Sequence, residues 1–215
     1  MKKKKFCIAL GLLAAFVLWT VAIRLIDVQA IGPRGSTVGF ATLNGFVHNF
    51  TGVHMQLYTI TDWLGLVPVV LVLGFAFLGL AQWIKRKSIL KVDRSILILG
   101  AFYIVTLAPY IFFESYVINY RPVLIEGSLE ASYPSSTTLL VLCVMPTARM
   151  QLHGRIQNSA LRKAVTVAIT SYIVFMVAGR LLSGVHWLTD IIGGILLSAG
   201  LVMIYESLIG GKIYE

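Results

Sequence analysis

Hydrophobic runs of about the length that crosses a lipid bilayer constrain this chain more than any other feature. A hydrocarbon core of about 30 Å is spanned by about 20 apolar residues in a helix. Of the 215 residues, 58% are hydrophobic and only 13% are charged, whereas a soluble domain of this length needs a more polar surface. We therefore predict an all-α fold, a polytopic membrane bundle of six transmembrane helices that forms one domain over residues 1–215. The expected spans are Phe6–Ile26, Trp63–Trp83, Ile96–Tyr116, Ser136–Met150, Val165–Leu182 and Trp187–Ile204.

The basic residues gather on one side of these expected spans. The chain has a formal net charge of +9, and its clusters Lys2–Lys5, Lys85–Arg94 and Arg149–Lys163 each flank a hydrophobic run. This placement is typical of the positive-inside bias of membrane proteins, and not of nucleic-acid binding. We expect a multi-pass protein of the plasma membrane with both termini in the cytoplasm. The apolar run after the initial lysines is longer than the core of a cleaved signal peptide, so we expect a retained helix.

Three segments are then expected on the extracytoplasmic face, namely Asp27–Asp62, Val117–Ser135 and Leu182–His186. The first segment mixes Gly, Asn and Thr with aromatic residues, which favours a short interfacial helix around Ala41–Ile60. The chemistry of the three segments should therefore decide the function of the protein.

His186 and Asp190 lie four residues apart at the start of the last expected helix, so they share one face of it. A carboxylate in this position can accept one ring N–H, fix the tautomer of the imidazole and leave the lone pair of the other nitrogen free. An ionisable pair at the membrane boundary is costly unless it is used or satisfied, which favours a functional role. The alternative is a pair that only caps and anchors the helix.

Two further outer features suit an anion. Arg121 lies just past the third expected span, against the general charge bias, and the arginine fork matches phosphate oxygens. The stretch Tyr133–Thr138 is typical of a helix start, with a Ser or Thr cap and free N–H groups that bind anions readily. The alternatives are an arginine that snorkels to lipid headgroups and an ordinary N-cap. Together with Arg180, these features predict a phosphate site beside an oriented histidine.

At this point the sequence resembles the type-2 phosphatidic acid phosphatase superfamily, also called the lipid phosphatase/haloperoxidase family. The pattern of that family has three parts: Lys-x6-Arg-Pro, then Pro-Ser-Gly-His, then Ser-Arg-x5-His-x3-Asp. The matching residues here are Arg121-Pro122, Pro134-Ser135 and Arg180-x5-His186-x3-Asp190. The resemblance implies that His186 forms a phosphohistidine and that Asp190 orients it. It also implies a phosphate site made by Arg121, Arg180, Ser135, Ser136 and Thr137, and a phosphorylated lipid as substrate.

The chain departs from the family pattern in three places. Glu114 stands where the family has lysine, Ser136-Thr137 stands in place of Gly-His, and Gly179 replaces a serine. In the family, the missing histidine is the general acid that protonates the leaving alcohol. General acid catalysis is typically worth about 10² to 10⁴ in rate.

Three interpretations of the missing histidine stay open at this stage. Another outer group could supply the proton, and the candidates are His48, His54 and a protonated Glu114. Alternatively, the leaving group is itself acidic, as in a diphosphate lipid. In the third interpretation the protein binds phosphorylated lipid without turning it over. A lipid phosphotransferase would use the same residues as a hydrolase.

The sequence does not indicate a metal or any other cofactor, because it has no cluster with metal-ligand spacing. Cys7 and Cys143 both fall in apolar segments, so we expect buried structural thiols. The expected partners are the phosphorylated lipid and the surrounding membrane lipids. The oligomeric state is left open.

Overall fold

The computed structural model describes residues 2–210, and this part of the chain is helical and has no β-strand. Two short 3-10 turns, η1 (Pro33–Gly35) and η2 (Ile89–Lys91), lie in the connections. The predicted all-α membrane fold is confirmed. The α-helices are α1 (Lys2–Leu25), α2 (Ala41–Thr51), α3 (Met55–Leu64), α4 (Leu66–Arg86), α5 (Arg94–Ser115), α6 (Ser136–His153), α7 (Ser159–Leu182) and α8 (Leu188–Ile209).

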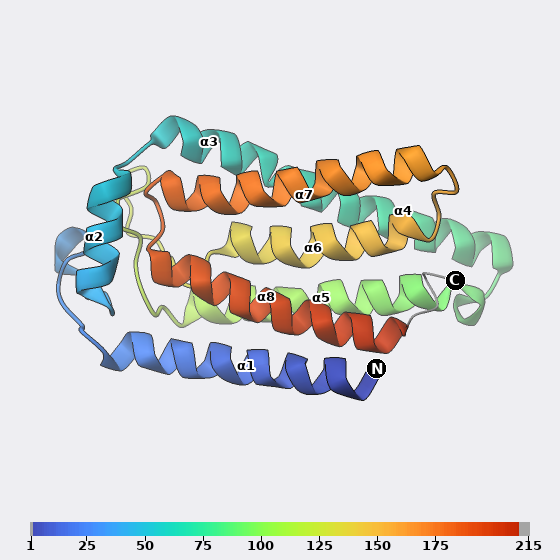
Figure 1. The fold of residues 1–215 in the computed structure, drawn as a ribbon, viewed down its shortest axis with the longest axis horizontal. Helices are drawn as coiled ribbons and strands as arrows, with labels where there is room; N and C mark the ends of the chain where they lie inside the picture. The colour runs from blue at the N-terminus through green and yellow to red at the C-terminus, as the bar shows by residue number, and fades with distance from the viewer. Residues whose placement is uncertain (1, 211–215) are drawn as a thin grey trace.

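The long helices run along a common direction, and the short helix α2 lies across one end of the bundle (Figure 1). Helix α1 begins and helix α8 ends at the opposite end (Figure 1). The connections α1–α3, α5–α6 and α7–α8 therefore all come together at the α2 end. This is the end that carries the three segments expected to decide the function.

Five helical stretches are long and apolar enough to cross a membrane: Lys3–Leu25, Met55–Arg86, Arg94–Ser115, Ser159–Leu182 and Leu188–Ile209. Helix α6 is not one of them, although it runs along the centre of the bundle (Figure 1) and packs against α4, α5, α7 and α8. The count of six spans and the cytoplasmic termini stay predictions.

The position of α6 explains its lower hydropathy. Its polar residues Thr147 and Gln151 are fully buried, and both have partners on neighbouring helices. Thr147 is hydrogen-bonded to the Tyr103 hydroxyl at 3.1 Å, and the Gln151 amide donates to the Tyr205 hydroxyl at 2.6 Å. Because protein surrounds α6 on most sides, its polar groups are satisfied within the bundle and the helix does not need an apolar surface all round.

The interfacial helix predicted around Ala41–Ile60 is wrong as a single element. The chain breaks at Gly52, which has a positive φ of 69°, and the second half, α3, runs on into α4 with only Gly65 between them. The break is fixed by close packing, since a Cβ added to Gly184 would lie 2.0 Å from the Gly52 carbonyl oxygen. The His54 N–H also donates to the Ser183 carbonyl at 3.0 Å. The turn between α7 and α8 is therefore docked onto the turn between α2 and α3.

The two cysteines differ in their surroundings. Cys143 is buried in α6, as expected, whereas Cys7 is exposed on α1. Helix α1 makes its main contact with α8 alone, so most of its surface, including Cys7, faces away from the bundle. The prediction of a buried thiol is therefore wrong for Cys7.

Candidate active site

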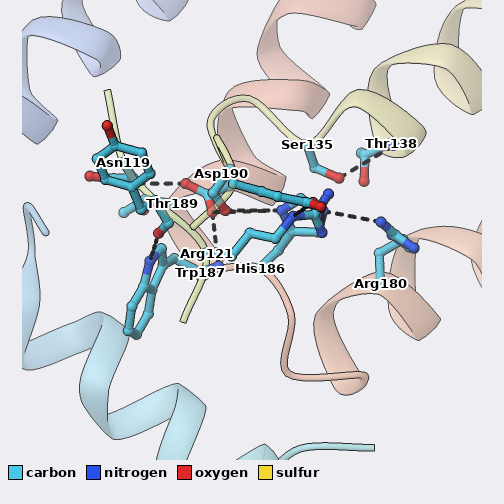
Figure 2. Close-up of polar contacts among 12 residues, drawn as sticks. Asn119, Arg121, Ser135, Thr138, Arg180, His186, Trp187, Thr189 and Asp190 are labelled. Carbon is cyan, nitrogen blue, oxygen red and sulfur yellow. Dashed lines mark hydrogen bonds and ion pairs between the residues drawn. The ribbon is translucent and has the colours of Figure 1, made fainter. Parts of the chain in front are cut away.

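Arg121, Arg180 and His186 come from three different connections or helix ends and meet at the α2 end of the bundle (Figure 2). Nε2 of His186 lies 3.3 Å from a terminal nitrogen of Arg121 and 3.3 Å from a terminal nitrogen of Arg180. All three side chains are buried, with exposed fractions of 8%, 1% and 3%. The structure thus places the imidazole between two guanidinium groups.

This environment keeps the imidazole neutral. Burial, followed by the positive charges of Arg121 and Arg180, holds the pKa of His186 well below its usual value of 6.5. A guanidinium only donates hydrogen bonds, so the Nε2 atom presents a lone pair toward both arginines. A neutral imidazole with a free lone pair is the form that can act as a nucleophile.

Asp190 lies at the first turn of α8, fully buried beside His186. The distance from its Oδ2 atom to Nδ1 of His186 is 3.8 Å, which is longer than a direct hydrogen bond. Its carboxylate instead accepts hydrogen bonds from the Asn119 amide at 3.2 Å, from the Trp187 N–H at 2.9 Å and from the Ser132 hydroxyl. The predicted pairing of His186 and Asp190 is present in space, but a serine hydroxyl lies between them.

A hairpin in the α5–α6 connection brings Asn119, Arg121 and Ser132 together. Its two arms exchange backbone hydrogen bonds, from Arg121 N–H to the Glu130 carbonyl at 3.0 Å and from Ser132 N–H to the Asn119 carbonyl at 2.9 Å. The turn has positive φ at both Glu126 (49°) and Gly127 (75°), as in the tight turns that suit a twisted hairpin. The register of this hairpin decides which side chains reach His186.

The N-terminus of α6 lies beside the same site. Ser135 is its N-cap, and the Ser135 hydroxyl accepts from the Thr138 N–H at 3.4 Å. The backbone N–H of Ser135 donates to the carbonyl of Asp190 at 3.2 Å. Thr137, predicted to bind phosphate, instead lies near the α3–α4 junction, where a Cβ at Gly65 would be 3.6 Å from its methyl group.

A cavity of about 270 Å³ opens onto the histidine. Of the three candidate proton donors, only Glu114 lines it. The His54 ring is bonded to the Thr51 carbonyl at 2.9 Å, and the His48 ring packs 5.4 Å from the Trp187 ring. Burial also lowers the pKa of His48, which disfavours the protonated form that an acid needs. The lining residues are Tyr110, Phe113, Glu114, Arg121, Glu130, Ala131, Ser132, Tyr133, Pro134, Ser136, Leu139 and His186.

Acidic partners of the two arginines lie at the rim of the site. The Glu130 carboxylate is 3.0 Å from Nε of Arg121, although the angle leaves that nitrogen without a hydrogen bond. Asp62 lies 3.7 Å from Arg180, and the Tyr58 ring lies 4.9 Å from the same guanidinium. Nε of Arg180 is buried and has no hydrogen-bond partner. The two guanidinium groups therefore have donor capacity left over, as expected of a site for an anion.

The glycine at position 179 has a packing role. A Cβ there would lie 2.8 Å from the methyl group of Thr61 on α3. The glycine lets α3 approach α7 closely, and this approach places Thr61 3.5 Å from Arg180. The family pattern has serine at this position, and this chain has glycine where the two helices pack closely.

Several residues that contact His186, Asp190 or the two arginines were not predicted from the sequence: Asn119, Ser132, Glu130, Asp62 and Tyr58. Asn119 lies two residues before Arg121 and Ser132 lies three before Ser135, so closeness to predicted residues was the only signal available. Within residues 2–210 no group of three or more His, Cys, Asp or Glu side chains is arranged to hold a metal ion.

Comparisons with known proteins identify the family and a similar fold. The family model described as the PAP2 superfamily matches residues 95–211, which is more than half of the chain. The fold is similar to the crystal structure of a transmembrane PAP2-type phosphatidylglycerolphosphate phosphatase from Bacillus subtilis, with a TM-score of 0.62 and 17% sequence identity. That similarity covers 93% of this chain and 94% of the other. No curated protein matches the chain significantly.

Proposed function

The chain belongs to the PAP2 superfamily, and from this premise we propose that it is a membrane lipid phosphatase that hydrolyses a phosphate monoester or a diphosphate lipid through His186. The observation that carries the proposal is the buried, neutral imidazole with its Nε2 lone pair between two arginines. Phosphoryl transfer through a covalent intermediate requires a nucleophile with cationic groups close to it. His186 and Arg121 line the cavity, and Arg180 lies behind them, 3.3 Å from the same ring nitrogen.

The proposed reaction has two steps. In the first, the Nε2 lone pair attacks phosphorus, the new N–P bond forms and the bond from phosphorus to the leaving oxygen breaks, with its electron pair staying on that oxygen. In the second, water attacks the phosphohistidine, the N–P bond breaks and its electron pair returns to Nε2. The water proton passes to solvent or to the departed group. Arg121 and Arg180 stabilise the charge on the phosphoryl oxygens in both steps.

The leaving oxygen decides whether an acid is needed. A phosphate leaving from a diphosphate lipid is stable without a proton, whereas an alkoxide leaving from a monoester is not. Glu114 is the candidate donor that lines the cavity, so we assign it the role of proton source for a monoester.

Replacing Glu114 with glutamine separates the two substrate classes. For a lipid monophosphate, kcat should fall about 10²-fold, because the proton source for the alkoxide is lost. For a lipid diphosphate, kcat should stay within a few-fold of wild type. Equal kcat values for wild type and Glu114→Gln on every monophosphate would remove Glu114 as an acid. Glu126→Gln, at the hairpin turn and away from the cavity lining, is the matched control.

The site is proposed to face the outer leaflet of the plasma membrane. Two observations support this orientation. The basic clusters Lys85–Arg94 and Arg149–Lys163 flank the helix ends opposite α2, where the positive-inside bias predicts the cytoplasm. The α5–α6 and α7–α8 connections, which carry Arg121 and His186, lie at the α2 end (Figure 1).

The experiment that tests the proposed function is phosphate release by the purified protein from a panel of lipid monophosphates and diphosphates. We expect release from at least one class, together with a transient, acid-labile and base-stable phosphoprotein after rapid quenching. No release from any lipid, with binding of the same lipids retained, would make a non-catalytic lipid-phosphate binder the better interpretation. Phosphate transfer to an added lipid alcohol, without free phosphate, would identify a phosphotransferase.

In a plot of kcat/KM against pH, the decline on the acid side should have its midpoint below pH 6.5. The pKa of His186 is lowered by burial, Arg121 and Arg180, and only the neutral ring can attack, so kcat/KM should hold at pH 7 and decline only at lower pH. Arg121→Gln removes one positive neighbour and should move this midpoint upward. A wild-type midpoint at or above pH 6.5, unchanged in Arg121→Gln, would contradict the electrostatic role of the arginines.

A further inference from the structure

We propose that Ser132 is a positioning residue that fixes the tautomer of His186 by bridging its Nδ1 atom to the carboxylate of Asp190. The proposal rests on the nucleophilic role proposed for His186, and it adds a residue that lies outside the three family motifs. The Ser132 Oγ atom lies 3.1 Å from Nδ1 of His186 and is also hydrogen-bonded to Oδ2 of Asp190.

The donors around Nε2 determine where the ring proton lies. Both groups near this nitrogen, on Arg121 and Arg180, are guanidinium N–H donors without acceptor capacity. The arginines therefore favour an unprotonated Nε2 and, in a neutral ring, a proton on Nδ1. An acceptor at Nδ1 is needed to hold the proton there. The Ser132 hydroxyl oxygen lies 3.1 Å from Nδ1, and the main chain of the same residue also contributes a hydrogen bond to the ring.

The Ser132 hydroxyl has only one proton to donate, and Asp190 receives it. An ionised carboxylate can only accept, so the direction of the bridge is fixed as Nδ1–H to Oγ and O–H to Oδ2. Asp190 is held in turn by the Asn119 amide and the Trp187 N–H. The direct separation of 3.8 Å between Nδ1 and Oδ2 leaves the serine as the link.

The backbone holds Ser132 rigidly in this place. The residue is 2% exposed, and its N–H donates to the Asn119 carbonyl at 2.9 Å. The next residue, Tyr133, packs between Phe16 and Phe113, with ring centroids 6.1 Å and 5.6 Å away. The Tyr133 hydroxyl is bonded to Thr20 at 2.7 Å. Contacts with α1 and α5 thus fix the position of Ser132 next to His186.

Loss of the Ser132 bridge should change the protonation of the His186 ring. In Ser132→Ala the Nδ1–H loses the hydroxyl that links it to Asp190, and only the main chain of residue 132 remains as a hydrogen-bond partner. The hold on the Nδ1–H tautomer is therefore weaker, and a shift of the proton to Nε2 removes the attacking lone pair. A wrong tautomer in a histidine-dependent enzyme can lower kcat by about 10⁴-fold. Because Asp190 remains nearby, we expect a smaller loss for Ser132→Ala, of about 10²-fold in kcat, with KM within about threefold of wild type.

The decisive measurement is the ¹⁵N NMR spectrum of protein labelled at histidine in lipid nanodiscs. The chain has only four histidines, and the His186 signals are assigned by their loss in His186→Ala. We expect a protonated Nδ1 and an unprotonated Nε2 in wild type, and a rise of the Nε2–H form in Ser132→Ala. Ser132→Cys has a thiol, which is a weaker donor and acceptor. Its fraction of the Nε2–H form should lie between those of wild type and Ser132→Ala. Ser198→Ala, a buried serine in α8 that bonds only within its own helix, is the matched control.

Two results would overturn the proposal. One is a proton on Nε2 in the wild-type protein, which can be read even if Ser132→Ala does not fold. The other is an Nδ1–H tautomer retained in a folded Ser132→Ala protein whose kcat is within threefold of wild type. The NMR spectrum reports the tautomer without any turnover. Absence of phosphate release would contradict the proposed function, whereas the spectrum alone decides the role of Ser132.

Discussion

Replacement of His186 by alanine is expected to lower kcat for phosphate release by about 10⁵-fold or more, on every lipid that the wild type hydrolyses. Removal of a covalent nucleophile costs about this much because no other group takes over the bond-forming step. Within the described residues, the other groups that line the cavity are carboxylates, hydroxyls, an arginine and apolar side chains, none of which combines neutrality with a free ring nitrogen. The measurement is single-turnover phosphate release, with rapid-quench detection of the phosphoprotein.

The controls separate chemistry from folding. His54→Ala changes an exposed histidine at the same end of the bundle, whose ring bonds only to the Thr51 carbonyl, and should keep wild-type activity. Because His186→Ala removes the acceptor beside two buried arginines, the thermal midpoint of the variant is measured to show that it is folded. If His186→Ala retained more than a hundredth of the wild-type kcat and still formed a phosphoprotein, His186 would not be the nucleophile.

The fold could be predicted largely from hydrophobic length. The runs near α1, α4, α5 and α7 leave most of their surface outside the bundle, so apolar composition marks them clearly. Helix α8 is more buried but is apolar enough to be marked in the same way. Helix α6 is different, because neighbouring helices satisfy its polar groups and relax the need for apolar residues. Its span was the shortest predicted, and its true C-terminal end, at His153, carries polar residues that a hydropathy pattern excludes.

The break after α2 could not be read from the sequence for another reason. The chain bends at Gly52 because the α7–α8 turn packs against it, and that contact joins residues far apart in the chain. A glycine in a helical pattern indicates a possible break but does not say which glycine is used. Gly45 lies inside α2, for example, whereas Gly52 ends it.

Some site residues could be predicted from their spacing along one helix or from their match to a family motif. His186 and Asp190 share a helix start, and Arg121, Ser135 and Arg180 fit the family motifs, so these positions were available from the sequence. Asn119, Ser132 and Glu130 depend on the register of a hairpin closed by backbone hydrogen bonds. A shift of the second arm by one residue would turn Glu130 and Ser132 to the other face, away from Asn119. The register depends on where the turn falls, and the sequence analysis did not identify the turn at Glu126 and Gly127.

The two arginines of the site carry charge that their surroundings compensate poorly. Each has a terminal nitrogen 3.3 Å from the same imidazole nitrogen, so the like charges lie close together. Arg180 is 1% exposed, and its acidic neighbour Asp62 lies 3.7 Å away with a side chain that is 59% exposed. Burial of a charge without a close, well-oriented partner destabilises a fold. An anion such as phosphate, bound in the proposed site, would offset this cost.

Arg180→Met is therefore expected to raise stability and remove activity together. A methionine fills similar space without a charge, so the free energy of unfolding should rise by about 1 to 3 kcal/mol, while kcat/KM for phosphate release falls about 10³-fold because a ligand for the transferred phosphoryl group is lost. Thermal melts with and without orthovanadate, together with phosphate release, test both parts. Vanadate should raise the melting temperature of the wild type but not of the variant, and Arg24→Met, which changes an exposed arginine at the same end, should respond like wild type. A lower melting temperature for Arg180→Met without ligand would show that Arg180 stabilises the fold. The expectation that Arg180 lowers stability in the absence of phosphate would then be wrong.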